Sequence, residues 1–448
     1  MDVAILAEYN PFSPGHAWQL QEIRKLLGGK TRIGVFMTQY FTQRGDLALL
    51  APKARAAQAL VSGADLVLGL PNQATLAAAP DFAQNFWASV VSLGSFDYVA
   101  FSAENPDSTF FDRLSTKLVD EGDRYETYLQ EALTDHGYFL AARLAAYDRL
   151  YGSAAPSTIL QEPNNILALE YYLARKRLEK ASIPSKLPQI LLLPRQGHEE
   201  GAGIQLEETE LLPSASQIRK LCAHFARPGI PPLDFASLIP RLAPGYPVEA
   251  FAILCYALAQ QKQLASLDAL GPFLFPTLEM KAQNLSPELL KDPVLARLAR
   301  AKISDFSSLS DLVGTLASKS LPQTRVRRTL LRLALGLLAE PSLEKAKIPA
   351  PAPYLRLLGA TKEGRQMLHR MKGLGSPKKP IIVGSAGRFL DASDPQVQEL
   401  ARKDYEMSQM VRRAVGLSRD EFFGPPLFIK RARRKDLLTD PSLAALLI

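Results

Sequence analysis

The N-terminal segment of the chain reads DVAILAEYNPFSPGH over residues 2–16. Its first six residues, Asp2–Ala7, form a short apolar run that is typical of a buried strand. A loop rich in proline follows, and residues 16–27 have helical spacing up to a Gly-Gly pair that ends the helix. The segment therefore predicts a strand, a loop and a helix in direct succession.

The same alternation continues along the first half of the chain. Further strands are expected at residues 32–37, 65–69, 98–102 and 189–193, with helices between them. Strands that alternate with helices form a parallel sheet, which binds ligands beyond the carboxyl ends of its strands. We therefore predict a Rossmann-like α/β domain over residues 1–228, with a ligand site at the loop 10–16.

The rest of the chain, residues 229–448, has a different pattern. It is predicted to form a mostly α-helical domain, interrupted by one strand-like piece at 380–384. Residues 351–448 hold 18 Lys and Arg against 10 Asp and Glu, a surplus equal to the net charge of +8. A basic C-terminal part on a neutral body indicates an anionic partner, with nucleic acid as the first expectation.

Cysteine content and hydropathy indicate the environment of the protein. The two cysteines, Cys222 and Cys255, fit neither a disulfide framework nor a metal motif, so no protein metal site is expected. No apolar run approaches the roughly 20 residues needed to span a bilayer, and no signal peptide is visible. We therefore expect a cytoplasmic protein with no membrane association, and nothing implies a protein partner.

The loop before the first helix has the features of a phosphate site. A helix N-terminus offers unpaired N–H groups and a positive dipole end, and Gly15 lets the backbone approach a ligand closely. His16 can donate a hydrogen bond to the charge that develops when a nucleophile attacks an α-phosphate. The alternative interpretation is a structural turn with a capping histidine.

Motifs further along the chain extend this interpretation. The loop resembles that of the HIGH-type nucleotidyltransferase superfamily, which ends in His-x-Gly-His, and the whole chain resembles the tRNA(Met) cytidine acetate ligase family. The matching stretches are AEYNPF at 7–12 with Gly15-His16, Met37 and Phe41 with QRG at 43–45, GADLV at 63–67, PNNIL at 163–167 with Glu170-Tyr171, SAS at 214–216 with Ile218-Arg219, TRVRR at 324–328, and ARKD at 401–404.

The resemblance implies a two-step reaction. ATP and acetate form acetyl-adenylate and pyrophosphate, and the acetyl group then passes to N4 of the wobble cytidine of elongator tRNA(Met), giving N4-acetylcytidine. ATP is thus the implied cofactor, with Mg²⁺ bound mainly through the phosphates. The implied partners are tRNA and acetate or another small carboxylic acid, with adenylation in the first domain and tRNA binding in the helical one.

The resemblance also implies roles for individual residues. Catalytic roles fall to Ser13, Gly15 and His16. The residues expected to bind ATP are Ala7, Glu8, Tyr9, Asn10, Pro11, Phe12, Gly15, His16, Ser102, Asn164, Asn165, Arg195, Ser216 and Arg219. Those expected to contact tRNA are Arg44, Arg325, Arg327, Arg328, Lys430, Arg431, Arg433 and Arg434.

Structural interpretations compete with several of these roles. One of the two asparagines can simply cap its helix. Arg195 can be a solvated surface residue, and the QRG stretch at 43–45 can be a plain turn. The arginines at 325–332 can form the wet face of an amphipathic helix, and the basic stretch at 430–435 can be a solvated tail.

Four departures from the family pattern lie at expected carboxyl ends of strands. The family has His at the position of Ser13, Gly-Asn at Gln39-Tyr40, Glu at Gly69 and Gly at Ser102. Their clustering suggests a divergent paralogue with a changed acid or acceptor. Two further classes stay open: a nucleotidyltransferase for a small phosphorylated metabolite, which the basic C-terminal part argues against, and a non-catalytic nucleotide-binding relative.

Overall fold

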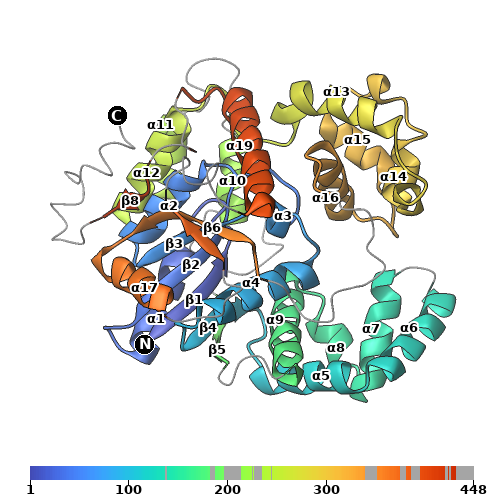
Figure 1. The fold of residues 1–448 in the computed structure, drawn as a ribbon, viewed down its shortest axis with the longest axis horizontal. Coiled ribbons are helices and arrows are strands. Elements are labelled where there is room, and N and C mark those ends of the chain that lie inside the picture. The colour runs from blue at the N-terminus through green and yellow to red at the C-terminus, as the bar shows by residue number, and fades with distance from the viewer. Residues whose placement is uncertain are drawn as a thin grey trace.

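The computed structural model describes residues 1–136, 139–181, 187–195, 213–224, 226, 235–243, 245–338, 351–373, 380–384, 394–418, 422 and 425–429. Within these described residues, eight strands form one sheet in the order β5-β4-β1-β2-β3-β6-β7, with β8 beside β6 (Figure 1). The strands are β1 Asp2–Ala7, β2 Arg32–Thr38, β3 Leu66–Leu70, β4 Tyr98–Ala103, β5 Gln189–Pro194, β6 Tyr354–Ala360, β7 Ile381–Val383 and β8 Leu427–Phe428. Paired strands are parallel except β3 and β6, which are antiparallel.

Helices surround this sheet. The first half of the chain forms α1 Pro14–Leu27, α2 Pro52–Val61, α3 Asn72–Thr75, α4 Ala79–Leu93, α5 Ser108–Asp120, α6 Gly122–His136, α7 Phe139–Tyr151, α8 Ala155–Ile159, α9 Pro163–Lys180 and α10 Ala215–His224. The second half forms α11 Phe235–Leu242, α12 Val248–Ala259, α13 Gly271–Ala282, α14 Pro293–Leu298, α15 Leu309–Leu316, α16 Gln323–Ala334, α17 Lys362–Gly373 and α19 Pro395–Val415. Short 3-10 turns lie at η1 Asp268–Leu270, η2 Leu289–Lys291 and η3 Ile303–Asp305. No helix in the described part of the chain is long and apolar enough to cross a membrane.

Alternate residues of the central strands enter two different cores. Val3 and Ile5 of β1 pack with residues of α1, α2, α10 and α12 on one face of the sheet. Ala4 of β1 and Phe36 of β2 pack with residues of α4, α9 and α17 on the other face. Both faces are covered by helices, and this explains why the parallel strands read as continuous apolar runs in the sequence.

The order of the strands creates a ligand position between β1 and β4. From β1 the chain moves outward to β2 and β3, and it returns to β4 and β5 on the opposite side of β1. Open α/β sheets bind ligands outside the carboxyl ends of the strands at this reversal of strand order. The loop after Ala7 and the loop after Ala103 both leave the sheet at this point.

The second half of the chain also contributes to the sheet. The strand expected at 380–384 is confirmed as β7, whereas β6 and β8 were not expected in a mostly helical region. Arg356 interrupts the apolar run of β6, yet only 4% of it is exposed because distant side-chain and backbone acceptors bind it. The domain boundary expected near residue 228 lies outside the described residues.

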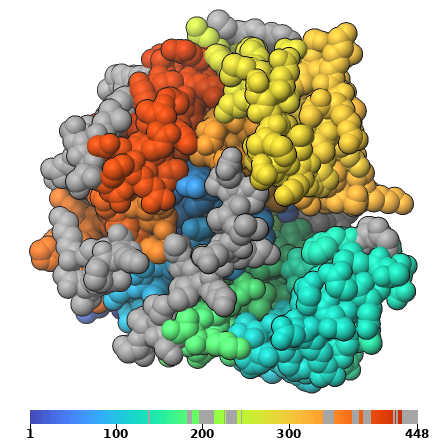
Figure 2. Space-filling model, turned by 45° about the vertical axis from the view of Figure 1, so that its right-hand side comes forward, coloured from blue at the N-terminus to red at the C-terminus, as the bar shows by residue number. Residues whose placement is uncertain are grey.

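The helices α13–α16 form a group (Figure 1) whose apolar residues share one core with residues of α19, β6 and β7. Figure 2 shows this yellow and orange group and the teal α5–α7 region as two separate masses on one face of the molecule. The core of the α13–α16 group also contains Tyr40, Phe41 and Leu47, which follow β2 in the sequence. The segment 40–47 therefore connects the sheet to the helical group.

Candidate functional site

Glu8 begins the loop between β1 and α1 and is held at both its backbone and its side chain. Its carbonyl accepts a hydrogen bond from the buried Arg55 side chain at 2.5 Å, and its carboxylate accepts one from the Gln43 backbone N–H at 2.7 Å. Burial raises the pKa of Glu8, and the Gln43 N–H, Arg44, Arg219 and Arg55 oppose this shift. The start of the loop is therefore fixed from β2 and α2.

The middle of the loop is tied to three further segments. The Asn10 side chain accepts a hydrogen bond from the Leu49 N–H at 2.7 Å. The Asn10 carbonyl accepts one from Arg219 of α10, and the Phe12 carbonyl accepts one from the Tyr246 hydroxyl. These contacts hold the loop in one shape before any ligand arrives, which is what binding of a transition state requires.

His16 lies in the first turn of α1, in contact with the rings of Tyr9 and Phe12 at centroid distances of 4.8 and 5.6 Å. Its Nδ1 accepts a hydrogen bond from the Ser13 N–H at 3.0 Å, and the Ser13 Oγ lies at the same distance. Burial and the nearby charge of Arg195 lower the pKa of His16 to about 3. The ring is therefore neutral near pH 7, with its hydrogen on Nε2 and available to a ligand.

Gly15 supplies a second donor at the same place. The Ser13 carbonyl accepts the N–H groups of His16 at 3.0 Å and of Ala17 at 3.2 Å. Gly15 occupies the first turn of α1, where a helix provides no acceptor of its own for the N–H. An anion placed at this helix end would meet the Gly15 N–H, the His16 Nε2–H and the positive end of the helix dipole.

Glu104, directly after β4, gathers three residues that were expected to bind ATP. Its carboxylate accepts hydrogen bonds from the Asn164 side chain at 2.5 Å and the Asn165 N–H at 3.0 Å, and lies 3.6 Å from Arg195 Nη1. The Asn165 side chain also accepts the Asn105 N–H at 3.0 Å. The Asn165 side chain thus ties α9 to the segment after β4, whereas the N-cap position of α9 is Glu162, so neither asparagine caps the helix as the alternative had it. Glu104 itself was not expected at the site, although its position after the fourth strand points to it.

Two further expected ATP contacts, Ser102 and Ser216, lie in β4 and in the first turn of α10. Ser102 of β4 accepts a hydrogen bond from the Gln19 side chain of α1 at 3.0 Å, which joins the two elements at the reversal of strand order. Ser216 is exposed in the first turn of α10. That turn is capped by reciprocal hydrogen bonds between Ser214 and Gln217 at 2.7 and 3.2 Å. Ser214 therefore caps α10 through its side chain.

Two of the four departures from the family pattern form one buried contact. The Gln39 side chain donates to the Leu70 carbonyl at 2.8 Å and accepts from Arg356 Nη1 at 3.1 Å. A Cβ at Gly69 would lie 3.0 Å from Gln39 Cγ, so glycine at this position makes room for the glutamine. Gln39 and Gly69 are therefore a coupled exchange in packing, away from solvent.

The residues expected to contact tRNA have different environments. Arg44 is exposed in the turn after β2, and 44% of the Arg325 side chain is exposed beside Asp292. Arg327 and Arg328 instead contact the segment 40–47. Four expected residues lie outside the described part of the chain: Lys430, Arg431, Arg433 and Arg434.

The carboxylates near the loop between β1 and α1 already accept hydrogen bonds from protein groups, and this affects how a metal ion could be bound. Glu8 and Glu104 both accept hydrogen bonds from protein groups. Among the described residues, no three or more His, Cys, Asp or Glu lie together in a way that could hold a metal ion. These side chains fit a Mg²⁺ ion that is carried by nucleotide phosphates and water better than one in a protein cage.

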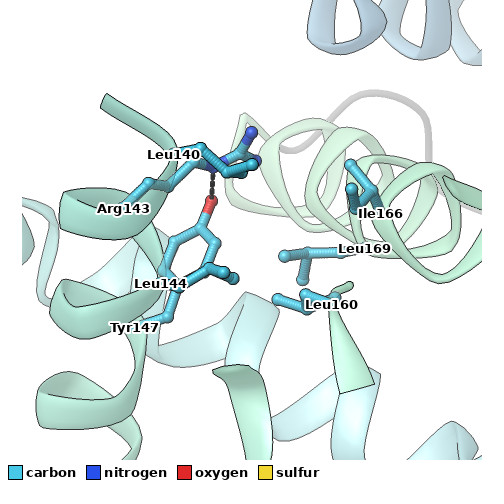
Figure 3. Close-up of a pocket in the computed structure, with 7 residues that line it drawn as sticks. All are labelled: Leu140, Arg143, Leu144, Tyr147, Leu160, Ile166 and Leu169. Atoms are coloured by element: carbon cyan, nitrogen blue, oxygen red, sulfur yellow. Dashed lines mark hydrogen bonds between the residues drawn. The ribbon is translucent and has the colours of Figure 1, made fainter. Parts of the chain in front are cut away.

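A small pocket between α7 and α9 contains none of the expected site residues (Figure 3). Its lining consists of Leu140, Arg143, Leu144, Tyr147, Leu160, Ile166 and Leu169. Arg143 donates to the Tyr147 hydroxyl at 2.6 Å and forms an ion pair with Glu170 at 2.7 Å. With its cation paired and its lining otherwise mostly apolar, this pocket offers no group for adenylation.

Comparison with known proteins places this geometry in a family. A sequence model described as HIGH Nucleotidyl Transferase matches residues 1–411. The tRNA(Met) cytidine acetate ligase of Acetivibrio thermocellus is 27% identical over 405 residues, covering 88% of this chain and 90% of that protein. The protein of the same name from Caldanaerobacter subterraneus subsp. tengcongensis is 26% identical over 423 residues, covering 94% and 98%.

A solved structure shares the fold over nearly the whole chain. Thermotoga maritima TmcAL bound with alpha-thio ATP superposes with a TM-score of 0.76 at 22% identity, covering 96% of this chain and 99% of that one. The apo form of the same protein gives a TM-score of 0.77 at 24% identity. The sheet and both helical regions therefore follow one common architecture.

Proposed function

The chain belongs to the HIGH nucleotidyl transferase family, and we propose that it is an ATP-dependent ligase that activates acetate as acetyl-adenylate and acetylates a tRNA. Acetate, cytidine and tRNA(Met) appear in the names of the similar proteins. N4 of the wobble cytidine of elongator tRNA(Met) is the acceptor that the motif resemblance implies. Adenylation is assigned to residues 1–228, completed by the C-terminal strands of the sheet, and tRNA binding to residues 229–448.

One observation carries this proposal: the pairing of a neutral His16 with the N-terminus of α1 at the reversal of strand order. In the first step a carboxylate oxygen of acetate attacks the α-phosphorus of ATP, and the bond to pyrophosphate breaks. Negative charge grows on the α-phosphate oxygens, where His16 Nε2–H and Gly15 N–H would donate. One such donor contributes roughly 10²–10³-fold to the rate, and no protein nucleophile is needed.

The second step transfers the acetyl group. The N4 amine of cytidine attacks the acetyl carbonyl carbon, the bond to AMP breaks, and the amine loses one proton. Asn164 and Arg195 would bind the nucleotide from the β4 side in both steps, while Ser216 and Arg219 would face the distal phosphates of ATP from α10 in the first step. Mg²⁺ would arrive with the phosphates and neutralise part of their charge. The free thiols of Cys222 and Cys255 fit a reducing cytoplasm.

The Gln39 contact bears on which acid is used. Gln39 and Gly69 are buried and bind protein groups, so they do not line a space for a larger acid. This favours acetate over the changed acid that the clustered departures had suggested. A non-catalytic relative is disfavoured because the donors at the α1 N-terminus are present and oriented.

Two measurements test the proposal. Pyrophosphate exchange across a panel of carboxylic acids should give the highest kcat/KM with acetate, and another acid that wins by tenfold or more would overturn the assignment of acetate. Mass spectrometry of tRNA nucleosides with and without the gene should show N4-acetylcytidine only when the gene is present. Binding of ATP without exchange for any acid would identify a non-catalytic relative instead.

A further inference from the structure

The segment 40–47, named here the linking loop, has its apolar residues in the core of the helical group. Tyr40, Phe41 and Leu47 are at most 5% exposed and pack with residues of α13–α16. Between them the backbone closes a tight turn, in which the Thr42 N–H donates to the Asp46 carbonyl at 2.9 Å. The linking loop is therefore anchored in the core of the helical group, although it follows β2 of the sheet.

Helix α16 packs directly on the tip of the linking loop. Arg327 Nη1 lies 2.8 Å from an Asp46 carboxylate oxygen, and Arg328 Nη1 donates to the Gln43 carbonyl at 3.3 Å. Gly45 has a φ of +79°, and a Cβ there would lie 2.8 Å from Arg327 Cβ and 3.0 Å from the Arg328 backbone N. Only glycine fits this backbone conformation and this close approach without strain.

The other side of the linking loop contacts Glu8, at the start of the loop between β1 and α1, which is named here the nucleotide loop (residues 8–13). The Gln43 N–H donates to the Glu8 carboxylate at 2.7 Å, and the Gln43 side chain donates to the Ala77 carbonyl at 3.2 Å. One residue, Gln43, thus donates through its backbone to Glu8 and accepts through its backbone from Arg328. Glu8 is joined to the rest of the nucleotide loop by the chain itself, so a shift of Gln43 is passed on to Asn10 and His16.

We propose that Arg327 and Arg328 are positioning residues for adenylation, which hold the linking loop against Glu8 and thereby fix the nucleotide loop. This role rests on the proposed function and differs from the tRNA contact expected from the sequence. A partly exposed ion pair such as Arg327–Asp46, with side chains 24% and 43% exposed, contributes little to overall stability. A displacement of about 1 Å in a reacting group, in contrast, costs about 100-fold in rate.

Pyrophosphate exchange without tRNA separates the two roles. Arg328→Ala and Gly45→Ala should raise the KM for ATP about tenfold or lower kcat by a similar factor, with no tRNA present. Arg327→Lys should retain most of the activity that Arg327→Ala loses, because lysine keeps the charge beside Asp46. The matched control is Arg297→Ala, since Arg297 binds the Leu316 carbonyl at 2.7 Å within the helical group and has no contact with the linking loop. This control should stay within twofold of wild type.

The double variant Asp46→Asn with Arg327→Ala should be no worse than Arg327→Ala alone, because both changes remove the same contact.

The proposal is overturned if Arg328→Ala and Gly45→Ala match wild type in tRNA-free exchange and show a defect only in tRNA acetylation. If wild type shows no exchange with any acid, the proposed function fails, and ATP affinity by titration calorimetry becomes the readout. A weaker Kd for ATP in Arg328→Ala than in Arg297→Ala then supports positioning, and equal Kd values reject it. If Gly45→Ala does not fold, the milder Asp46→Asn replaces it with the same expected direction.

Discussion

The Ser13 N–H holds His16 through Nδ1, and this contact does not depend on the Ser13 side chain. The family has a histidine at the position of Ser13, so this chain lacks one imidazole at the α-phosphate. A serine hydroxyl brings no positive charge to the site. What this chain retains is the orientation of the second histidine, because any residue at position 13 other than proline offers the same backbone donor.

The first prediction concerns these two side chains. His16→Ala should lower kcat for pyrophosphate exchange about 10²–10³-fold, the loss typical of one oxyanion donor. Ser13→Ala is the matched control and should cost only a few-fold, because the donor to Nδ1 is in the backbone. Steady-state exchange kinetics at saturating ATP would check both. Equal losses in the two variants would show that His16 is not the principal donor.

The second prediction concerns pH. With a pKa of about 3, His16 stays neutral from about pH 5.5 to 8, so its titration should produce no break in kcat near 6.5, the ordinary histidine value. The unfolded state binds the extra proton below pH 6.5, and the folded state does not until about pH 3. The free energy of unfolding therefore falls as pH drops through this window, and His16→Gln should remove that part of the decrease. Urea unfolding at about pH 7 and 4.5 measures it, and identical pH dependence in both proteins would contradict the shift.

At the scale of elements, the contact between Gln39 and Gly69 joins β2, β3 and β6. Arg356 of β6 donates to Gln39 Oε1 and to the Phe422 carbonyl at 3.0 Å, and its guanidinium lies 4.4 Å from the centre of the Phe422 ring. Gly69 pairs with Arg356 across the antiparallel strands. A glutamate at position 69, as in the family pattern, would face this cation directly, so Gln39 takes over the position of acceptor.

The third prediction tests this coupled exchange. Gly69→Ala should destabilise the protein by about 1–3 kcal/mol, because its Cβ would overlap Gln39. Gln39→Gly should cost less in the Gly69→Ala background than in the wild type, because there its removal also relieves the overlap. Gly314→Ala is the control, since nothing lies within 4 Å of a Cβ there and alanine favours the helix α15. Urea unfolding of Gly69→Ala, Gln39→Gly, their double variant and the control gives the four values, and a purely additive double variant would reject the coupling.

Elements with a local signal were predictable, and those held by distant partners were not. The four apolar runs after β1 could be read directly from the sequence. Within the helical half, α14 begins at Pro293 because Asp292 caps it, with its carboxylate 2.8 Å from the Val294 N–H. Strand β6 was missed because the acceptors of Arg356 lie 317 and 66 residues away.

The residues of the candidate site also divide into those with a local sequence signal and those held by distant partners. The loop expected to bind the nucleotide, with Gly15 and His16, was predicted from its own residues. The role of Glu104 and the contact of Arg327 with Asp46 join positions 60 and 281 residues apart, and no local pattern encodes such a pairing. The family resemblance assigned Arg327 and Arg328 to tRNA, whereas their hydrogen bonds join α16 to the linking loop.

At the scale of the whole molecule, we propose two distinct uses for positive charge, which are positioning of a loop and contact with tRNA. Arg327 and Arg328 are engaged with the linking loop, while Arg325 is more exposed and the basic stretch at 430–435 follows β8. Charges that contact phosphates release counterions, so the affinity falls with salt in proportion to the number of phosphates that are neutralised. Charges that position a loop do not produce this dependence. Salt therefore separates the two uses in one experiment.

The fourth prediction follows from this difference. A chain that ends at Ile429 lacks the basic stretch. For this shortened chain, the slope of log affinity for tRNA against log salt concentration should be less steep than for the wild type. The difference should be about 0.7–0.9 for each phosphate that is no longer neutralised. Arg325→Ala should reduce the slope by the amount expected for about one phosphate, whereas Arg327→Ala should leave the slope unchanged.

Lys302→Ala is the charge-matched control, because Lys302 is 77% exposed in an ion pair with Asp305 and belongs to neither group. Fluorescence anisotropy from about 50 to 200 mM salt measures all four slopes. An unchanged slope in the shortened chain would remove the basic stretch from the tRNA surface, and a reduced slope for Arg327→Ala would return Arg327 to it.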